Sequence, residues 1–539
     1  MAQLQFKGKS FVQNHHLVVP YHELIPRPDK SLTDKVSLQD NLILHGDNLL
    51  ALKALLPMYA GKVKCIYIDP PYNTGNEGWA YNDNVNSPMM QDWLGKVVDR
   101  DDLTRHDKWL CMMMPRLKLL RELLRDDGAI FVSIDDNEVH HLRCIMDDVF
   151  GEDSFVATVI WQKMYSPKST ARHFSEDHDY VLAYARHAEL WVRGLLPRTA
   201  EMDARYGNPD NDPRGDWKAG GLDARNYYSR GTYAITCPSG RVIPAPPKGS
   251  YWRVSEDKFK ELVQDNRIWW GETGNSVPAI KRFLSEVMKG RVPQTLWLHG
   301  EVGHTQSAKK ELVSLVEFES SDDVFVTVKP SSLIRRILEI ATDSDSVVLD
   351  SFAGSGPTAQ AVLALNKEDG GDRRFILVEC EDYADSLTAQ RVRRVINGAP
   401  GARDDAVKEG LGGTFSFFDL GKPIELGSLL SGKHLPPYGE LARYVFYTAT
   451  GEEFDEGKVD EARGFIGESK TYHAYLMYVP DVEKLKNLAL TLDWAKALGA
   501  PKGKRRLVFA PTKYLDQDHL DKYWIDYAQL PYEIYGLVR

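Results

Sequence analysis

The first 190 residues alternate between short apolar runs and segments with the spacing of an amphipathic helix. Helical spacing covers 48–61, which ends at a glycine, and 106–128. Two prolines must end the apolar run that begins at residue 62. The strands that this pattern predicts are NLILHGD (41–47), KVKCIYIDPPY (62–72), GAIFVSID (128–135) and DYVLAYAR (179–186).

The same alternation resumes near residue 324. VFVTVKP (324–330) leads into a predicted helix over 331–342. The segment SVVLDSFAGSGPTAQAVLALN (346–366) predicts a strand, a glycine-rich turn and a helix, and RRFILVEC (373–380) predicts the next strand. Strands that alternate with helices predict an α/β fold: a mostly parallel, doubly wound, Rossmann-like sheet with helices on both faces.

Two stretches break this alternation and set the expected domain boundaries. Residues 187–320 are rich in Gly, Pro, Trp, Tyr and Arg and have weak periodicity, which predicts an inserted domain with much loop. Beyond residue 400, the strands AYLMYVP and RRLVFAP around one helix, KLKNLALTLDWAKAL, predict a small α/β region. We therefore expect four parts, of which the first and third form one catalytic domain: 1–186, 187–320, 321–400 and 401–539.

Composition narrows the class of protein. The 539 residues are 43% hydrophobic and 27% charged, as in folded soluble proteins, and no apolar run is long enough to span a bilayer. The opening MAQLQFKGKS lacks the apolar region of a secretory signal, so we expect a cytoplasmic protein without a membrane partner. Five scattered cysteines without a CxxC pair argue against disulfides and a zinc site. We expect them to be reduced core residues and expect no metal.

The charge is unevenly distributed along the chain. The whole chain carries a formal charge of −10, which by itself argues mildly against nucleic-acid binding. Residues 161–310 contain 23 Lys+Arg and 17 Asp+Glu, so this segment carries +6 and the remainder −16. A basic middle inside an acidic protein indicates a local surface for a polyanion, although chance patchiness is the alternative.

The motif Asp69-Pro70-Pro71-Tyr72 ends a predicted buried strand, at the edge where open α/β sheets bind ligands. The prolines stiffen the turn and leave the Pro70 carbonyl free to face a ligand. This carbonyl, the Asp69 carboxylate and the Tyr72 ring suit an exocyclic amino group on a planar base. The acceptors would hold both N–H bonds and leave the nitrogen lone pair aimed at an electrophile. The alternative is an ordinary strand-ending turn with a capping Asp.

A second motif, Asp350-Ser351-Phe352-Ala353-Gly354-Ser355-Gly356, follows an apolar strand and opens a helix. Its small residues let a ligand approach the backbone, and the helix start leaves amide donors free. Pro357 suits a first helical turn. Glu379, at the end of the next strand, can accept hydrogen bonds from ribose hydroxyls. A dinucleotide oxidoreductase would share these features, so this motif alone leaves that class open.

A third motif, Gly46-Asp47-Asn48, ends the first predicted strand. Asp47 is placed to accept a hydrogen bond from a cofactor adenine, to cap the next helix, or to do both. An oxidoreductase would account for the glycine-rich turn and for Glu379, but it would leave the motif at 69–72 without a role.

Together these segments resemble amino-methylating DNA methyltransferases. The motifs that carry the resemblance are DPPYNTGN, FAGSG and ILVE. Their order, with DPPY first and FAGSG late, resembles the beta class, in which a target-recognition domain lies between the two halves. Four longer segments are similar in sequence to the modification (Mod) subunits of type III restriction systems and their solitary relatives. They are ILHGDNLLALKAL, YIDPPYNTGNEGWAYND, GAIFVSIDDNEVHHLR and LWLHGEVGHTQSAKKEL. The resemblance covers roughly 40–400.

The resemblance implies an enzyme that transfers a methyl group from S-adenosylmethionine to N6 of an adenine flipped out of double-stranded DNA. An opening Asp in the first motif is typical of adenine-N6 enzymes. The implied catalytic residues are Asp69, Pro70, Pro71 and Tyr72. The implied cofactor residues are Asp47, Lys329, Asp350, Phe352, Ala353, Gly354, Gly356 and Glu379. One departure is Pro357, where the family more often has Thr.

The DNA surface follows from the same resemblance. Trp79 and Tyr81 are candidate aromatics at the flipped base, although either could simply pack. Basic residues of the middle segment could contact phosphates or guanines, and the alternative for each is a solvated charge. They are Arg225, Arg230, Arg241, Arg253, Arg267, Lys281 and Arg282. The resemblance also implies a homodimer. Whether a separate restriction subunit with helicase and nuclease activity exists does not follow from the sequence, and any cleavage would need such a second polypeptide.

Other functions remain possible on the sequence alone. An N4-cytosine methyltransferase would have the same fold and differ in its product. An RNA or protein-amide methyltransferase would share the fold, but the basic insert disfavours it. A DNA-binding subunit without activity is disfavoured by the intact DPPY. The recognition sequence and the role of 401–539 do not follow from the sequence.

Overall fold

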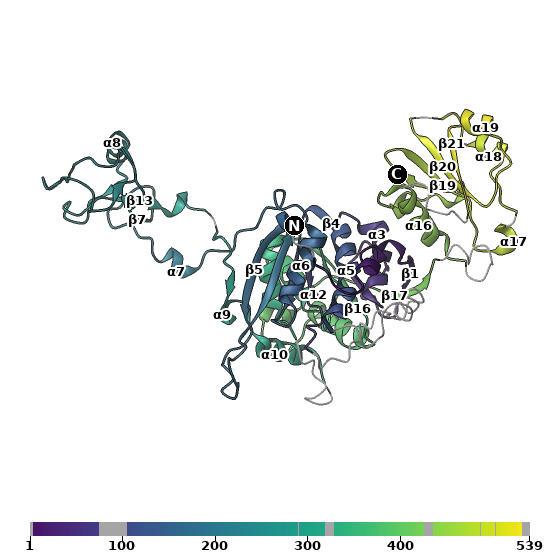
Figure 1. Cartoon of the computed structure of the whole chain (residues 1–539), viewed down its shortest axis with the longest axis horizontal. Coiled ribbons are helices and arrows are strands. Elements are labelled where there is room, and N and C mark those ends of the chain that lie inside the picture. The colour runs from purple at the N-terminus through teal and green to yellow at the C-terminus, as the bar shows by residue number, and fades with distance from the viewer. Residues whose placement is uncertain are drawn as a thin grey trace. The chain divides into compact units, whose positions relative to one another are not determined.

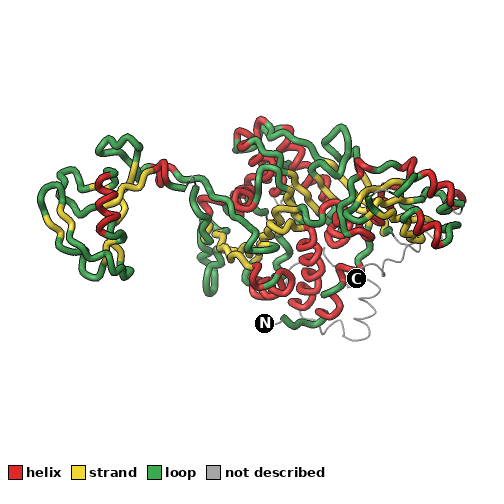
Figure 2. The backbone as a smooth tube through the Cα atoms, turned by 90° about the horizontal axis from the view of Figure 1, so that it is seen from above, coloured by secondary structure: helices red, strands yellow, loops and turns green. Residues whose placement is uncertain are grey.

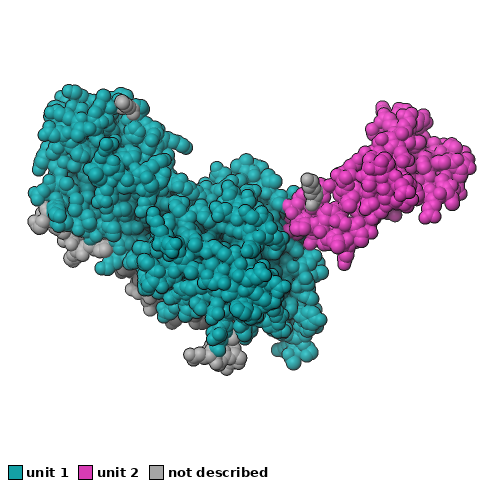
Figure 3. All heavy atoms as spheres, turned by 180° about the vertical axis from the view of Figure 1, so that it is seen from behind, with its two compact units in different colours: residues 1–194, 294–539 teal, residues 195–293 magenta. Residues whose placement is uncertain are grey.

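The computed structural model of the chain describes residues 4–74, 105–288, 290–318, 328–424, 435–485, 487–501 and 503–530. It divides into two compact units, coloured in Figure 3: residues 1–194 with 294–539, and residues 195–293. The second unit is shorter than the insert expected at 187–320, because residues 187–194 and 294–320 belong to the first unit, whose large sheet includes Leu296 and Trp297.

The first unit is built on a ten-stranded sheet (Figure 1). Strand pairing is parallel from β17 through β4 and again between β5 and β14. β1 pairs antiparallel with β17, and β6 pairs antiparallel with both β4 and β5. The predicted mostly parallel α/β sheet is therefore confirmed. In spatial order the strands are β1 (His22–Pro26), β17 (Ser416–Pro423), β2 (Leu42–His45), β16 (Arg374–Glu379), β15 (Val347–Asp350), β3 (Val63–Ile68), β4 (Leu124–Ile134), β6 (His178–Ala185), β5 (Phe155–Gln162) and β14 (Leu296–Trp297).

Helices cover both faces of this sheet (Figure 2). Ile376 and Val378 of β16 point into the core that α3, α5 and α6 fill, whereas Leu377, between them, faces the start of α12. The helices of this unit up to the last sheet strand are α1 (Lys9–Val12), α2 (His15–Val18), α3 (Asn48–Tyr59), α5 (Arg105–Leu123), α6 (Val139–Phe150), α9 (His299–Val302), α10 (Thr305–Leu315), α11 (Ser331–Ala341), α12 (Pro357–Asp369), α13 (Gln390–Asn397) and α14 (Asp405–Glu409), with a π-helical turn at Ala384–Ala389 and a 3₁₀ turn at Glu152–Ser154.

The C-terminal region forms a smaller α/β layer, as expected, but it begins later than residue 401, because β17 still belongs to the large sheet. The single helix predicted over 484–498 is wrong, because Thr491 accepts a hydrogen bond from the Trp494 amide and starts a new helix. The elements are α16 (Tyr438–Thr450), β18 (Phe465–Glu468), β19 (Tyr472–Leu476), α17 (Val482–Leu485), α18 (Leu492–Ala497), β20 (Arg505–Ala510), α19 (Gln517–Lys522) and β21 (Ile525–Gln529), with 3₁₀ turns at Glu456–Lys458 and Glu461–Arg463.

The second unit has little regular structure, as its composition predicts. Its strands pair as β12–β13–β7, β10–β9 and β11–β8 around a small core that contains the fully buried Trp252. The elements are α7 (Ala200–Asp203), β7 (Trp217–Gly221), β8 (Asp223–Ala224), β9 (Ile235–Thr236), β10 (Val242–Ile243), β11 (Tyr251–Trp252), α8 (Glu256–Gln264), β12 (Ile268–Trp269), β13 (Ala279–Phe283) and a 3₁₀ turn at Leu284–Glu286.

Lys281 of β13 does not fit its predicted role as a DNA contact. Its side chain is buried, and its ammonium pairs with both Asp210 and Asp212. Arg214 and Lys281 hold the pKa of Asp212 well below its usual range. Lys281 therefore neutralises carboxylates inside the second unit and is not available to a polyanion.

Two expectations from composition can be compared with the structure. None of the helices in the described parts of the chain is long and apolar enough to cross a membrane. All five cysteines are free thiols. Only Cys65 and Cys237 are buried, whereas Cys144 is exposed on α6, so the expectation that the cysteines are core residues holds for two of them.

Replacing Lys281 by Ala leaves two carboxylates close together without their shared cation. Breaking a buried ion pair on one side costs roughly 3–5 kcal/mol, so we expect the free energy of opening of residues 195–293 to fall by about this amount. Native-state hydrogen exchange measures it. Arg282→Ala is the matched control, because Arg282 neighbours Lys281 but is exposed. Equal opening free energies in the two variants would contradict the assigned role.

Candidate active site

Four neighbouring strands deliver the predicted motifs to one edge of the sheet. Asp69 follows β3, Asp350 ends β15, Glu379 ends β16, and Asp47 comes after β2. These strands are adjacent in the order β2–β16–β15–β3 and run parallel, so their carboxyl ends meet. This is the edge at which ligands bind in open α/β sheets.

A cavity of about 620 Å³ lies at this edge and contains both main motifs. Six carboxylates and two lysines line it, which favours a ligand that carries positive charge. Its lining residues are Tyr67, Asp69, Pro70, Pro71, Tyr72, Thr74, Asp135, Trp161, Lys163, Met164, Glu176, Asp179, Thr305, Val328, Lys329, Asp350, Phe352, Ala353, Gly354, Ser355, Pro357, Glu379 and Tyr383.

Lys329 and Asp69 form the central ion pair of the cavity. The Lys329 ammonium donates to both Asp69 carboxylate oxygens, at 2.8 and 2.7 Å. It also lies 4.9 Å from the centre of the Tyr72 ring and 6.0 Å from that of Trp161. The Lys329 ammonium therefore lies between the Asp69 carboxylate and the face of the Tyr72 ring. This is the position that we expect for the amino group of a base.

Burial, followed by the charge of Asp69, raises the pKa of Tyr72 well above its usual value, so its hydroxyl stays neutral. This hydroxyl is buried near the Asp69 carboxylate. Tyr72 thus supplies the cavity with an uncharged ring.

The turn that carries Tyr72 is held from behind by two helices. The Trp109 indole of α5 donates to the Pro71 carbonyl at 2.7 Å. The next residue, Asn73, is buried with a φ of 58°, a left-handed conformation that Asn tolerates better than most residues. Its side chain donates to the Arg105 carbonyl and to the carboxylate of Glu138, the residue that precedes α6.

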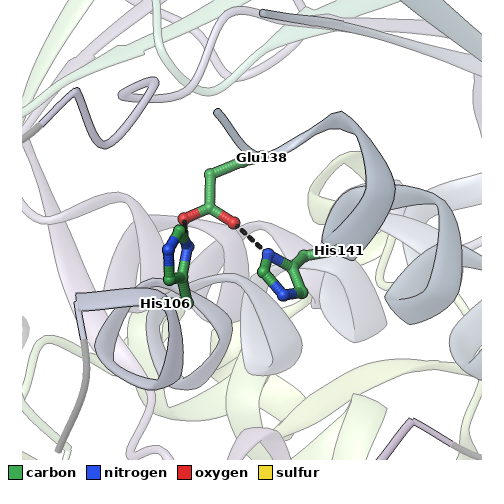
Figure 4. A group of neighbouring side chains, drawn as sticks. All are labelled: His106, Glu138 and His141. Carbon is green, nitrogen blue, oxygen red and sulfur yellow. Dashed lines mark hydrogen bonds and ion pairs between the residues drawn. The ribbon is translucent and has the colours of Figure 1, made fainter. Parts of the chain in front are cut away.

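Glu138 is fully buried and shares its carboxylate with two histidines (Figure 4). Nδ1 of His106 lies 2.6 Å from one carboxylate oxygen, and Nδ1 of His141 lies 2.8 Å from the other. Together with Asn73 these contacts satisfy a carboxylate that would otherwise be costly to bury. The cluster fixes the turn of the first motif to α5 and α6.

The glycine-rich turn has the conformation that its sequence predicts. Gly356 adopts a φ of 77° and precedes α12, which starts at Pro357. The Gly354 amide donates to Glu379 at 2.7 Å, and the Thr388 hydroxyl donates to the Gly354 carbonyl at 2.6 Å. These hydrogen bonds attach the turn to the end of β16. The turn residues Ala353, Gly354 and Ser355 line the cavity.

Two acidic groups of this turn have strongly shifted pKa values. Burial raises the pKa of Asp350 to about 7, against the hydrogen bonds that it accepts from Thr358 and from the Phe352 amide. Burial likewise raises the pKa of Glu379 to about 7, although it accepts three backbone hydrogen bonds. Buried carboxyl groups of this kind are poised to ionise when a cation approaches.

Asp47 lies beside this arrangement and does not line the cavity. Its carboxylate accepts hydrogen bonds from the Leu49 and Leu50 amides and caps α3, which is one of the two roles expected of it. Gly356 is also absent from the lining, and its contribution is the shape of the turn. The predicted aromatics Trp79 and Tyr81 lie outside the described residues.

The basic candidates of the second unit differ in how accessible they are. Arg225, Arg230, Arg241, Arg253 and Arg282 are exposed. Arg267 is partly buried and pairs with Asp265 and Glu286. Five of the seven predicted DNA contacts are thus open to a partner, Arg267 is engaged in ion pairs, and Lys281 is internal.

Sequence reasoning missed several lining residues. Trp161 and Lys163 lie at the end of β5, which was not predicted, although the β-branched residues of FVATVIWQ gave a signal for it. Asp179 begins a strand that was predicted, and burial raises its pKa despite its ion pair with Lys163. Nothing in the local sequence shows that these side chains meet Asp69.

Residues 63–390, more than half of the chain, match the family model described as DNA methylase (N6_N4_Mtase). The chain belongs to this family. The match runs from the start of β3 to the start of α13 and so contains both motifs that line the cavity.

Relatives of the chain include two type III subunits and a type II enzyme. It is 36% identical over 388 residues to the type III restriction-modification enzyme StyLTI Mod subunit of Salmonella typhimurium, covering 70% of the chain and 58% of that relative. It is 28% identical to the EcoPI Mod subunit of Escherichia phage P1, covering 76% and 70%. It is 30% identical to the type II methyltransferase M.KpnI of Klebsiella pneumoniae, covering 62% and 79%. The resemblance to Mod subunits is confirmed.

Replacing Glu138 by Ala should release the Asn73 side chain and loosen the turn that carries Tyr72. Loss of a buried, hydrogen-bonded charged group costs about 2–3 kcal/mol, which denaturant unfolding measures. Hydrogen exchange at residues 69–74 should speed up as well. Cys144→Ala is the control, because Cys144 is exposed on the same helix and lies outside the cluster. If Glu138→Ala were as stable as Cys144→Ala, the cluster would not hold the turn.

Proposed function

We propose that the protein is a site-specific DNA methyltransferase that uses S-adenosylmethionine to methylate N6 of adenine. The observation that carries this proposal is one cavity in which Asp69, the Pro70 carbonyl and the Tyr72 ring lie together with Asp350, Glu379 and the glycine-rich turn. The first group suits a planar base with an amino group. The second suits a cationic nucleoside.

The cavity fits S-adenosylmethionine in size, charge and donor set. Glu379 would accept hydrogen bonds from ribose hydroxyls, and Phe352, Ala353 and Gly354 would line the methionine and ribose side. The excess of carboxylates would favour the sulfonium and ammonium charges. When bound, the cofactor supplies an electrophilic methyl group on sulfur.

The protein's own residues then position the amino group that is to be methylated. Asp69 and the Pro70 carbonyl accept its two N–H bonds, and Tyr72 stacks on the base. The target N–H replaces one of the hydrogen bonds that Lys329 now gives to Asp69, and Lys329 keeps that carboxylate oriented. Asp69 is the group placed to receive the amino proton, since its oxygens face the nitrogen.

The target adenine must leave the helix to reach this cavity, at a cost of roughly a few kcal/mol. Stacking on Tyr72 offsets about 1–3 kcal/mol of that cost. Adenine is favoured over cytosine because the motif begins with Asp. N4-methylcytosine as the product would keep the site and change the base.

The second unit is proposed to read the DNA sequence, through the exposed residues Arg225, Arg230, Arg241, Arg253 and Arg282. It lies between the two halves of the catalytic unit in the sequence, and exposed arginines are suited to phosphates and guanines. By analogy with the relatives named as subunits of restriction-modification enzymes, we propose a homodimer that associates with a separate restriction subunit.

Asp69→Ala should abolish methyl transfer and spare cofactor binding. We expect the rate to fall by at least ~100-fold, because the variant loses an oriented acceptor for the amino group. The cofactor Kd should change by less than about fivefold, since Glu379 and the glycine-rich turn remain. Radiolabel transfer to DNA and calorimetry measure the two quantities. Asp136→Ala, at an exposed carboxylate outside the cavity, is the control. A rate within fivefold of the wild type would contradict the assignment.

The affinity for S-adenosylmethionine should rise with pH between about 6 and 8. Asp350 and Glu379 have pKa values of about 7 in the folded protein, above the values of the unfolded chain. Their ionisation therefore destabilises the folded protein as pH rises, and a bound cation reverses that cost. Each group can contribute up to about tenfold in Kd per pH unit below its pKa of about 7, and the profile levels off above that pH. Glu379→Gln should flatten the profile, and an unchanged slope would contradict this account.

A further inference from the structure

The loop that joins β5 to β6 forms one wall of the cavity and extends beyond it. Its two ends, Lys163 with Met164 and Glu176, line the cavity together with Trp161 and Asp179 of the flanking strands. Residues 165–175 lie between these ends and are not part of the lining. A ligand in the cavity that is part of a larger molecule would therefore meet this loop at the entrance.

The loop is ordered by its own hydrogen bonds. The Lys163 amide donates to the Asp177 carbonyl at 2.9 Å, and the Lys168 amide donates to the Ser175 hydroxyl at 2.7 Å. Ser175 in turn donates to the Asp177 carboxylate. These contacts hold the two sides of the loop together and present residues 169–174 as a defined tip.

The base of the loop is also anchored to the segment that follows β14. The Lys163 carbonyl accepts a hydrogen bond from the Thr305 amide at 3.1 Å. The Tyr165 ring lies 5.1 Å from the ring of His299, with the two rings edge to face. The tip is thus carried on a base that contacts Thr305 and His299 of the first unit.

The tip combines an exposed aromatic ring with cations. Phe174 is 90% exposed, more than any other large hydrophobic side chain in the described parts of the chain. Lys168, Arg172 and His173 are exposed beside it. The side chains of Lys168, Arg172 and Phe174 make no hydrogen bond, ion pair or ring contact with the described residues. A partner that offers both stacked planar groups and phosphates would satisfy all of them.

We propose that Phe174 is a wedge that enters the DNA duplex where the target base has left it. The ring stacks between the bases on either side of the gap, while Lys168 and Arg172 contact flanking phosphates. This inference rests on the proposed function and adds to it a residue that stabilises the extruded state. Tyr72 holds the base inside the cavity, and Phe174 keeps the base from returning to the stack.

The test uses two duplexes that carry the methylation site of the protein. In one the target adenine is paired with thymine, and in the other it faces an abasic site, so that extrusion costs less. We expect Phe174→Ala to slow methylation of the paired duplex by about tenfold or more, the loss that corresponds to one base–aromatic contact. On the abasic duplex the rate should return to within about threefold of the wild type. Phe174→Trp should retain activity on both.

Two further variants separate the wedge from other roles. Tyr514→Ala removes another highly exposed aromatic, in the C-terminal region at 79% exposure, and should change neither rate. Arg172→Ala should weaken binding to both duplexes equally and make the salt dependence shallower, as expected for a phosphate contact. Fluorescence of 2-aminopurine at the target position should rise on binding of the wild type and rise less with Phe174→Ala.

Three results would overturn the wedge. In the first, Phe174→Ala matches Tyr514→Ala on the paired duplex. In the second, Phe174→Ala loses activity equally on both duplexes, which indicates general binding or a partner-protein surface. In the third, the wild type methylates neither duplex while still binding the cofactor, which overturns the proposed function and the wedge together. Only the third affects the function itself.

Discussion

Parallel pairing of β3 with β15 is the constraint on which the site depends. The two strands come from opposite ends of the catalytic region, and their register brings Ile66 beside Leu349. Each strand then ends in its own motif, one suited to a base and the other to a nucleoside cofactor. A single sheet edge therefore holds both reactants, and the segment between the two halves can be a separate unit without disturbing it.

Electrostatics explains how several carboxylates can share this edge of the sheet. Six carboxylates around one cavity would repel one another, and the chain limits this in two ways. Lys329 and Lys163 each pair with one carboxylate, Asp69 and Asp179. Burial raises the pKa of Asp350 and Glu379 to about 7, so both are partly protonated near neutral pH. The same carboxyl groups make the cavity attractive to a cation. The groups that are fixed in place by folding are therefore also the groups that would give the cavity its affinity for a cationic ligand.

The sequence alone was sufficient to predict those elements whose pattern is continuous along the chain. β3, β15 and β16 are almost entirely buried and contain short unbroken apolar runs, CIYI, VVL and FILV. The helix start at Gly356 and Pro357 follows from local sequence. β5 and β1 were missed because their residues are only partly buried, so their patterns are mixed. The break at Thr491 did have a local signal, a capping residue before LDWAKA, which the helical spacing outweighed.

The sequence alone could not predict contacts between residues that lie far apart in the chain. Lys329 and Asp69 are 260 positions apart, and no spacing rule shows that they pair. Lys281 looked like its neighbour Arg282 because both are cations in a basic segment. Only the folded unit shows that Lys281 faces Asp210 and Asp212 while Arg282 faces solvent. A single sequence shows which residues could carry charge to a surface, and tertiary folding decides which of them reach it.

The central claim is that the cavity at this sheet edge methylates adenine in DNA, and single-molecule sequencing tests it most directly. DNA would be sequenced from methylation-free cells that express either the wild type or Asp69→Ala at equal levels. The account predicts N6-methyladenine at one short motif with the wild type and none with the variant. The same N6-methyladenine pattern from both proteins, or unmodified DNA from cells with folded, cofactor-binding wild type, would contradict it.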